Sequence, residues 1–205
     1  MSSTNRSNAR DTHISDYYVT PRDCIRNFLG NWLEDLQSNL KDDILMVGER
    51  PDRAYWLDPC AGGDEKHCMS YPDVIKSEFD PNVLTTMDIR ENSPAEIKGD
   101  YLLTEIEKNY YDVIITNPPF NIAREIIEKA LEDVKVGGYV VMLLRLNFFG
   151  SKQRFDFWEK QLPVWAYVHH RRMSFTDDNK TDSIEYMHAV WQKGNKPKYT
   201  MLKII

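Results

Sequence analysis

The sequence predicts an α/β fold whose mostly parallel sheet is covered by helices on both faces. Two observations predict it. Apolar, β-branched runs alternate along the chain with segments of helical periodicity, and several of these runs end in glycine- or proline-rich turns. The 205 residues are 41% hydrophobic and 28% charged, which is typical of one globular domain with a sizeable core.

The first predicted helix begins at Thr20 and Pro21. Thr20 suits an N-cap, Pro21 suits the first helical position, and Asp23 favours the positive end of the helix dipole. Apolar residues recur at helical spacing from Ile25 to Leu40. We therefore expect this helix to pack on the core.

Strands and helices are expected to alternate over the rest of the chain. Residues 1–15 are polar and are expected to form a flexible tail before a single domain at 16–205. Strands are predicted at 54–57, 83–87, 111–116, 139–146, 164–169 and 184–192, and helices at 73–79, 102–108, 122–134 and 155–162.

The three cysteines, Cys24, Cys60 and Cys68, are widely spaced, which favours reduced thiols. No metal site is expected, because Cys60, His67 and Cys68 lack a second ligand pair. No apolar window is long enough to cross a membrane, and the N-terminus lacks the apolar core of a secretory signal. These features predict a cytoplasmic protein with no membrane partner.

The net charge of −6 argues weakly against a nucleic-acid partner. The charge is unevenly distributed, however, because residues 151–205 carry ten lysines and arginines against six acids. Two interpretations stay open: a local basic face that holds a phosphate backbone, or surface charge without such a role.

The first long strand ends in the glycine-rich segment Asp58-Pro59-Cys60-Ala61-Gly62-Gly63. Small residues let a backbone approach a ligand closely, and a nearby acid can accept hydrogen bonds from it. A plain Gly-Gly turn is the alternative interpretation.

Two further acids are candidate ligand contacts: Asp88 follows a predicted strand, and Asp100 precedes a predicted helix. Asp88 stands where a ribose diol is bound in many nucleotide-binding α/β units, although it could also be a solvated loop acid. Asp100, next to Tyr101, could cap a helix or receive an amino group of a purine ring.

The most specific segment is Asn117-Pro118-Pro119-Phe120, which directly follows a buried strand. The Asn117 side-chain oxygen and the Pro118 carbonyl are two acceptors that could hold the hydrogens of an amino group on a flat ring. Phe120 could stack on that ring. Such a site acts by positioning and fixed dipoles, with no strong base. A proline strand terminator with a packed phenylalanine is the alternative.

Together these motifs resemble those of class I S-adenosylmethionine-dependent N6-adenine DNA methyltransferases over about residues 16–192. The resemblance implies a Rossmann-like fold with a mostly parallel seven-stranded sheet, and S-adenosylmethionine as cofactor. It assigns catalysis to Asn117, Pro118, Pro119 and Phe120. It assigns cofactor binding to Tyr18, Thr20 and Pro21 in an N-terminal Tyr-x-Thr-Pro motif, to Asp58, Pro59, Cys60, Ala61 and Gly62, to Asp88, Asp100 and Tyr101, and to Asn117.

The order of the motifs is similar to the gamma subgroup, and the segment from Arg172 resembles small phage-encoded members. The resemblance places Phe175 against the target base and makes Arg172 a substrate-binding residue. It implies methyl transfer to adenine in duplex or single-stranded DNA, with relaxed or short-site specificity, in a bacterial cell or phage-infected host. Asp64 stands where many members have a glycine, and no separate target-recognition domain is expected.

Three alternatives stay open. The substrate could be adenine in RNA, or the chain could be a non-catalytic nucleic-acid-binding subunit. A protein-glutamine methyltransferase also uses Asn-Pro-Pro but typically has tyrosine at the position of Phe120. The sequence leaves the recognition site and the oligomeric state open.

Overall fold

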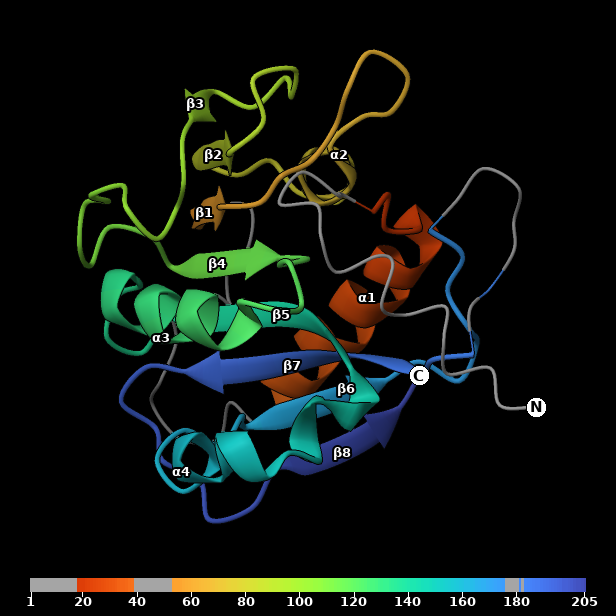
Figure 1. Ribbon diagram of the computed structural model, residues 1–205, viewed down its shortest axis with the longest axis vertical. Helices are drawn as coiled ribbons and strands as arrows, with labels where there is room; N and C mark the ends of the chain where they lie inside the picture. The colour runs from red at the N-terminus through yellow and green to blue at the C-terminus, as the bar shows by residue number, and fades with distance from the viewer. Residues whose placement is uncertain (1–17, 39–52, 176–180, 182) are drawn as a thin grey trace.

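The computed structural model describes residues 18–38, 53–175, 181 and 183–205. The predicted tail at 1–15 lies outside these residues. The described chain forms an eight-stranded sheet in the order β3-β2-β1-β4-β5-β7-β6-β8, visible as the central layer in Figure 1. The strands are β1 (Tyr55–Asp58), β2 (Val83–Asp88), β3 (Ile97–Lys98), β4 (Val113–Thr116), β5 (Tyr139–Arg145), β6 (Trp165–Val168), β7 (Tyr186–Gln192) and β8 (Met201–Ile204).

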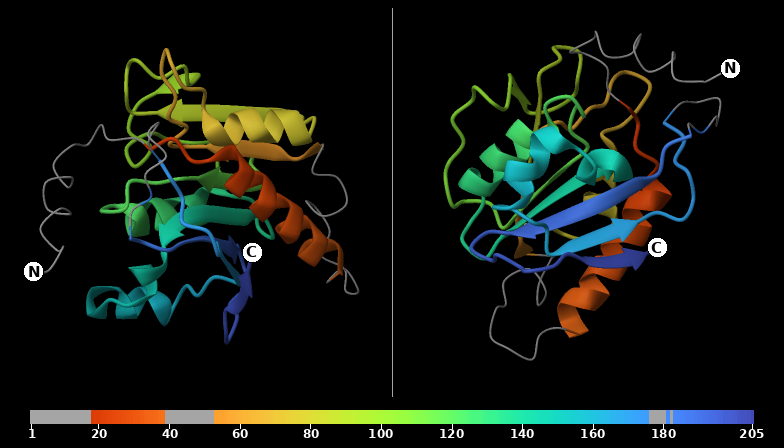
Figure 2. Two further views of the ribbon diagram at one scale, coloured as in Figure 1. Left: turned by 90° about the vertical axis from the view of Figure 1, so that its right-hand side faces the viewer. Right: turned by 60° about the horizontal axis from the view of Figure 1, so that its bottom comes forward.

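Four α-helices of the described chain cover the two faces of this sheet. Their bounds are α1 (Arg22–Ser38), α2 (Ser70–Glu78), α3 (Ala123–Asp133) and α4 (Phe155–Trp158). Successive residues of β4 point to opposite faces, so that Val113 and Ile115 join the core under α1 and α2, whereas Ile114 joins the core under α3 and α4. Figure 2 shows α1 on the face opposite α3 and α4. The prediction of an α/β sheet with helices on both faces is confirmed.

The strand directions are mostly parallel. The pairs β1–β2, β1–β4, β2–β3, β4–β5 and β6–β8 are parallel, and β7 is antiparallel to both of its neighbours, β5 and β6. All four residues of β4 are buried, as expected for a strand covered on both faces. The parallel strands consequently present their carboxyl ends at one edge of the sheet.

The predicted count of seven strands is wrong for the described chain, which has eight. β3 contains two residues and pairs only with the end of β2, so it is too short to leave a periodic pattern. β8 lies at the opposite edge beside β6, where Met201, Leu202 and Ile204 stay exposed. An edge strand with so little burial lacks the apolar alternation by which strands are recognised.

The prediction of a helix at 102–108 is also wrong, because the structure has turns and irregular backbone there. The Asp100 carboxylate accepts a hydrogen bond from the backbone N–H of Leu102, and Leu103 is 83% exposed. The aspartate side chain thus stabilises a local turn in place of a helix. The helix predicted at 155–162 shortens to α4. No helix of the described residues is both long and apolar enough to cross a membrane.

Candidate active site

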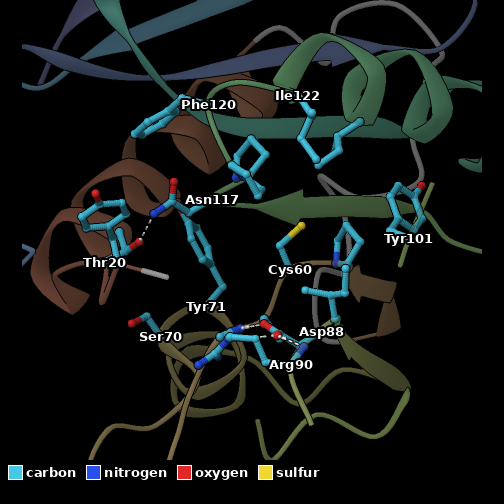
Figure 3. A pocket seen from close by; sticks show the side chains of 18 of the residues that line it. Thr20, Cys60, Ser70, Tyr71, Asp88, Arg90, Tyr101, Asn117, Phe120 and Ile122 are labelled. Carbon is cyan, nitrogen blue, oxygen red and sulfur yellow. Dashed lines mark hydrogen bonds and ion pairs between the residues drawn. The ribbon is translucent and has the colours of Figure 1, made fainter. Parts of the chain in front are cut away.

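A pocket opens at the carboxyl ends of β1, β2 and β4 and encloses about 940 Å³, part of which is open to solvent. This is the edge at which open α/β sheets bind ligands. Its walls come from the segment before α1, the turns after β1, β2 and β4, the start of α2 and the segment 99–101 (Figure 3).

Most of the predicted site residues line this one pocket. Pro21, Asp58, Arg172 and Phe175 are not part of its lining. The lining includes Tyr18, Thr20, Pro59, Cys60, Ala61, Gly62, Asp88, Asp100, Tyr101, Asn117, Pro118, Pro119 and Phe120.

Asn117 directly follows β4, and its side chain is held by the segment before α1. The amide Nδ2 of Asn117 donates a hydrogen bond of 3.1 Å to Oγ1 of Thr20, drawn in Figure 3. Thr20 is only 2% exposed. Because the amide nitrogen is engaged, the carbonyl oxygen of Asn117 is left as an acceptor for a ligand.

The bond to Asn117 also corrects the role predicted for Thr20 as a helix cap. The backbone N–H groups of Cys24 and Ile25 donate to the carbonyl of Pro21, and the hydroxyl of Thr20 instead accepts from Asn117. A tertiary partner for a threonine hydroxyl leaves no trace in local sequence.

Aromatic contacts join Phe120 to Phe175. Tyr186 of β7 lies between them, with ring centroids 5.9 Å from Phe120 and 4.9 Å from Phe175. Phe175 also meets Tyr18 edge-on at 5.8 Å. Phe175 therefore lies one ring away from the Asn-Pro-Pro-Phe turn, beside the pocket.

The glycine-rich turn after β1 depends on close packing. Gly62 and Gly63 have φ angles of 70° and 78°, which side chains other than that of glycine rarely adopt. A Cβ added to Gly63 would lie 2.9 Å from side-chain carbons of both Met69 and Pro94. The turn therefore requires glycine at position 63 for space as well as conformation.

Asp88 holds this turn from the end of β2. Its Oδ2 accepts the backbone N–H of Gly62 at 2.8 Å, and its Oδ1 accepts the backbone N–H of Arg90 at 2.8 Å and the Arg90 Nε at 3.1 Å. Arg90 in turn donates to the carbonyl of Gly63 at 2.9 Å. A carboxylate has about four acceptor positions, so Asp88 keeps capacity for a ligand hydroxyl.

Asp58 lies beneath the turn and is fully buried. Its Oδ1 accepts the backbone N–H of Cys60 at 3.2 Å. Burial raises the pKa of Asp58 to about 7. Its position suits shaping the turn from below, whereas Pro59, Cys60 and Ala61 present the surface that a ligand would touch.

The segment 99–101 forms the wall that lies opposite Phe120 along the pocket in Figure 3. The hydroxyl of Tyr101 donates to Oδ2 of Asp133 in α3 at 2.8 Å, which fixes the ring, and burial raises the pKa of that hydroxyl. Asp100 shapes its own turn through Leu102 while lining the pocket.

The cationic side chains that the sequence indicated are partly engaged. Arg172 pairs with Glu185 at 3.4 Å, and both side chains are about half exposed. Arg154 donates to the carbonyl of Phe148 at 2.7 Å. Asp64 accepts backbone N–H groups of its own turn and does not line the pocket. Asp177 and Asp178, which the sequence offers as alternative ion-pair partners for Arg172, lie outside the described residues.

Sequence reasoning missed several residues of the pocket and its surroundings. Arg90 could have been noticed because it comes two residues after Asp88, whereas Ser70 and Tyr71 carry no local signal.

The Tyr71 hydroxyl is 2.8 Å from Nε2 of His188, whose Nδ1 is 2.8 Å from Nε2 of His169. Burial lowers the pKa of His169 to about 4 and that of His188 well below its usual value, so both rings are neutral near pH 7.

Within the described residues, no group of three or more histidine, cysteine or acidic side chains is placed to hold a metal ion. The pocket is instead a mixed surface of glycine turns, aromatic rings and a few polar groups. Such a lining suits an organic cofactor with a ring and a hydroxylated sugar.

No protein-family model and no curated protein matches this sequence. Solved structures nevertheless share its fold. A candidate class I S-adenosylmethionine-dependent methyltransferase from Listeria monocytogenes matches with a TM-score of 0.60 at 15% identity, over 91% of this chain and 65% of that one. A predicted O-methyltransferase from Agrobacterium tumefaciens matches at 0.50 and 14%, over 75% and 79% of the two chains. A candidate RNA methyltransferase from Pyrococcus horikoshii matches at 0.51 and 12%, over 69% and 76%.

The chain therefore has the Rossmann-like fold of class I methyltransferases, a class whose cofactor is S-adenosylmethionine. It spans 65% of the length of the Listeria protein. At such low identities the likeness establishes the fold alone.

Proposed function

We propose that this protein transfers a methyl group from S-adenosylmethionine to the N6 amino group of adenine in DNA, with relaxed or short-site specificity. Residues 16–205 would form its single catalytic domain. One observation carries the proposal: Asn117 stands in the pocket at the end of β4, with its amide nitrogen engaged by Thr20 and its oxygen left to accept.

All the cofactor residues in the proposal except Pro21 and Asp58 line one continuous pocket. Gly62 and its neighbours give the close backbone approach, Asp88 retains an acceptor for a ribose hydroxyl, and Asp100 and Tyr101 form the wall for the adenine ring. Tyr18, Thr20 and Pro21 would hold the methionine end. When bound, S-adenosylmethionine supplies an activated methyl group on a positively charged sulfur.

The amino group of adenine is poorly nucleophilic, because its lone pair is delocalised into the ring. Asn117 Oδ1 and the Pro118 carbonyl would accept its two hydrogens, which favours a more tetrahedral nitrogen with its lone pair aimed at the methyl group. Pro119 would hold the turn rigid, and Phe120 would stack on the ring. The chain supplies position and fixed dipoles for this reaction.

The target base has to leave the stack, or lie in a single strand, to reach such a pocket. Phe175 lies one ring from Phe120 through Tyr186, which supports a role against the extruded base. Arg172, about half exposed, would contact the phosphate backbone.

The test is transfer of tritiated methyl groups from S-adenosylmethionine to duplex DNA, single-stranded DNA, RNA and protein in parallel. Label in N6-methyladenine of DNA supports the proposal. Label in RNA alone would support the RNA alternative, and label in protein would contradict a nucleic-acid substrate. Cofactor binding without any transfer would favour a non-catalytic subunit, and no binding by calorimetry would contradict the cofactor assignment.

A further inference from the structure

Arg145 is a cation beside the Asn-Pro-Pro-Phe turn that neither the sequence motifs nor the pocket lining assigned. It is the last residue of β5, the strand next to β4, and it is in register with Tyr186 of β7. Its guanidinium carbon lies 4.6 Å from the centre of the Phe120 ring. Arg145 is thus stacked on the aromatic side chain proposed to contact the target base.

The guanidinium of Arg145 has unused hydrogen-bonding capacity. Its Nε is buried and has no hydrogen-bond partner, and within the described residues no carboxylate forms an ion pair with it. Other arginines are engaged: Arg124 pairs with Asp156 at 2.9 Å, and Arg154 donates to a backbone carbonyl. A buried donor without a partner costs free energy, which is recovered if a ligand supplies the acceptor.

A cation at this position cannot serve the methyl transfer itself. S-adenosylmethionine, when bound, would supply a methyl group on a cationic sulfur, so the reacting atoms near Phe120 would carry positive charge. A nearby guanidinium would repel that charge unless an anion lies against it. An anion that comes with the substrate therefore accounts for Arg145 better than a catalytic role does.

We infer that Arg145 binds a phosphodiester group of the polynucleotide substrate next to the target nucleotide. This inference rests on the proposed function, because it assumes that the base enters over Phe120. Guanidinium groups form charge-assisted, often bidentate hydrogen bonds with phosphate. The Phe120 ring packs against the guanidinium, and phosphate binding would neutralise the cation. The contact would favour a polynucleotide over a free nucleoside or a glutamine side chain.

The test compares Arg145→Met and Arg145→Lys with the unaltered protein. Affinity for a synthetic DNA duplex and for a single strand is measured at several salt concentrations, and affinity for S-adenosylmethionine is measured by calorimetry. The matched control is Lys76→Met, which removes the same charge from an exposed site in the last turn of α2. That turn lies toward the amino ends of the strands, away from the pocket.

We expect Arg145→Met to weaken DNA binding about tenfold. It should also reduce the slope of log affinity against log salt by about one unit. Arg145→Lys should keep the slope and lose part of the affinity, because it keeps a charge without the planar fork. S-adenosylmethionine affinity should stay unchanged in both, and Lys76→Met should behave like the unaltered protein.

Unchanged DNA affinity and salt slope in both variants would overturn the inference and leave the proposed function standing. A loss of cofactor affinity in Arg145→Met would also overturn the inference, because Arg145 would then bind the carboxylate of the cofactor and not a phosphate of the substrate. If the unaltered protein binds RNA but not DNA, the same variants are measured on RNA, and a reduced slope there would support the phosphate contact while contradicting the DNA proposal. Binding to neither polymer would overturn both.

Discussion

The two ends of the pocket are built in different ways. At the Asp88 end, hydrogen bonds among Gly62, Gly63, Asp88 and Arg90 fix the backbone. At the Phe120 end, the described contacts are mainly ring against ring, through Tyr186 and Phe175, with a cation on Phe120. A cofactor of one shape suits directional hydrogen bonds, whereas a polymer of varied sequence suits stacking surfaces and charge, because every base has a π-face.

Asn117 stands where the two ends meet, and its removal should have the largest effect. Asn117→Ala removes the acceptor for the amino group, so we expect methyl transfer to fall about 10²–10³-fold, with a much smaller loss of cofactor affinity and a melting temperature nearly unchanged. Single-turnover assays measure methyl transfer, titration calorimetry measures cofactor affinity, and scanning calorimetry measures the melting temperature. Activity close to that of the unaltered protein would contradict the role assigned to Asn117.

Asp88→Asn should distinguish the two ends of the pocket, because it should weaken cofactor binding at the Asp88 end and leave DNA binding at the Phe120 end unchanged. The substitution replaces an acceptor of the Gly62 and Arg90 donors by an N–H₂ group, and a charge-assisted hydrogen bond contributes about 1.5–3 kcal/mol. We expect cofactor affinity to fall about thirtyfold in calorimetry, with DNA affinity unchanged. Asp64→Asn is the control, because Asp64 also accepts backbone N–H groups but lies outside the pocket. Equal losses in both variants would show that the effect is not specific to the pocket.

Phe175→Leu should weaken substrate binding at the Phe120 end of the pocket only. Loss of base stacking should raise the KM for DNA about tenfold, with no change in cofactor affinity. A duplex that carries an unpaired target adenine measures the stacking contribution without the cost of base extrusion. A KM that does not change on either DNA would remove Phe175 from the substrate site.

Thr20 holds Asn117, which stands where the two ends of the pocket meet. Substitution of Thr20 should have the smallest effect on methyl transfer. Thr20→Val keeps the shape but removes the acceptor for Asn117 Nδ2, so the Asn117 side chain becomes free to rotate. We expect kcat to fall about fivefold, more than the KM for DNA changes, and Thr20→Ser to restore it. A loss confined to cofactor affinity would instead make Thr20 a cofactor contact alone.

The sequence predicted the α/β class, six of the strands and the long helices, because apolar periodicity reports burial within one element. It failed where burial is low or local chemistry competes. β8 is an exposed edge strand, β3 is two residues long, and Asp100 forms a turn where periodicity indicated a helix.

What the sequence by itself predicted is the set of strand ends that line the pocket: the glycine turn after β1, Asp88 at the end of β2 and Asn117 after β4. Each depends on residues a few positions apart, so local pattern is sufficient. The tertiary structure alone decided that Thr20 holds an amide 97 residues away, that Asp88 ties down the glycine turn and that Arg145 lies on Phe120. Those contacts depend on the order of strands in the sheet, which no local pattern encodes.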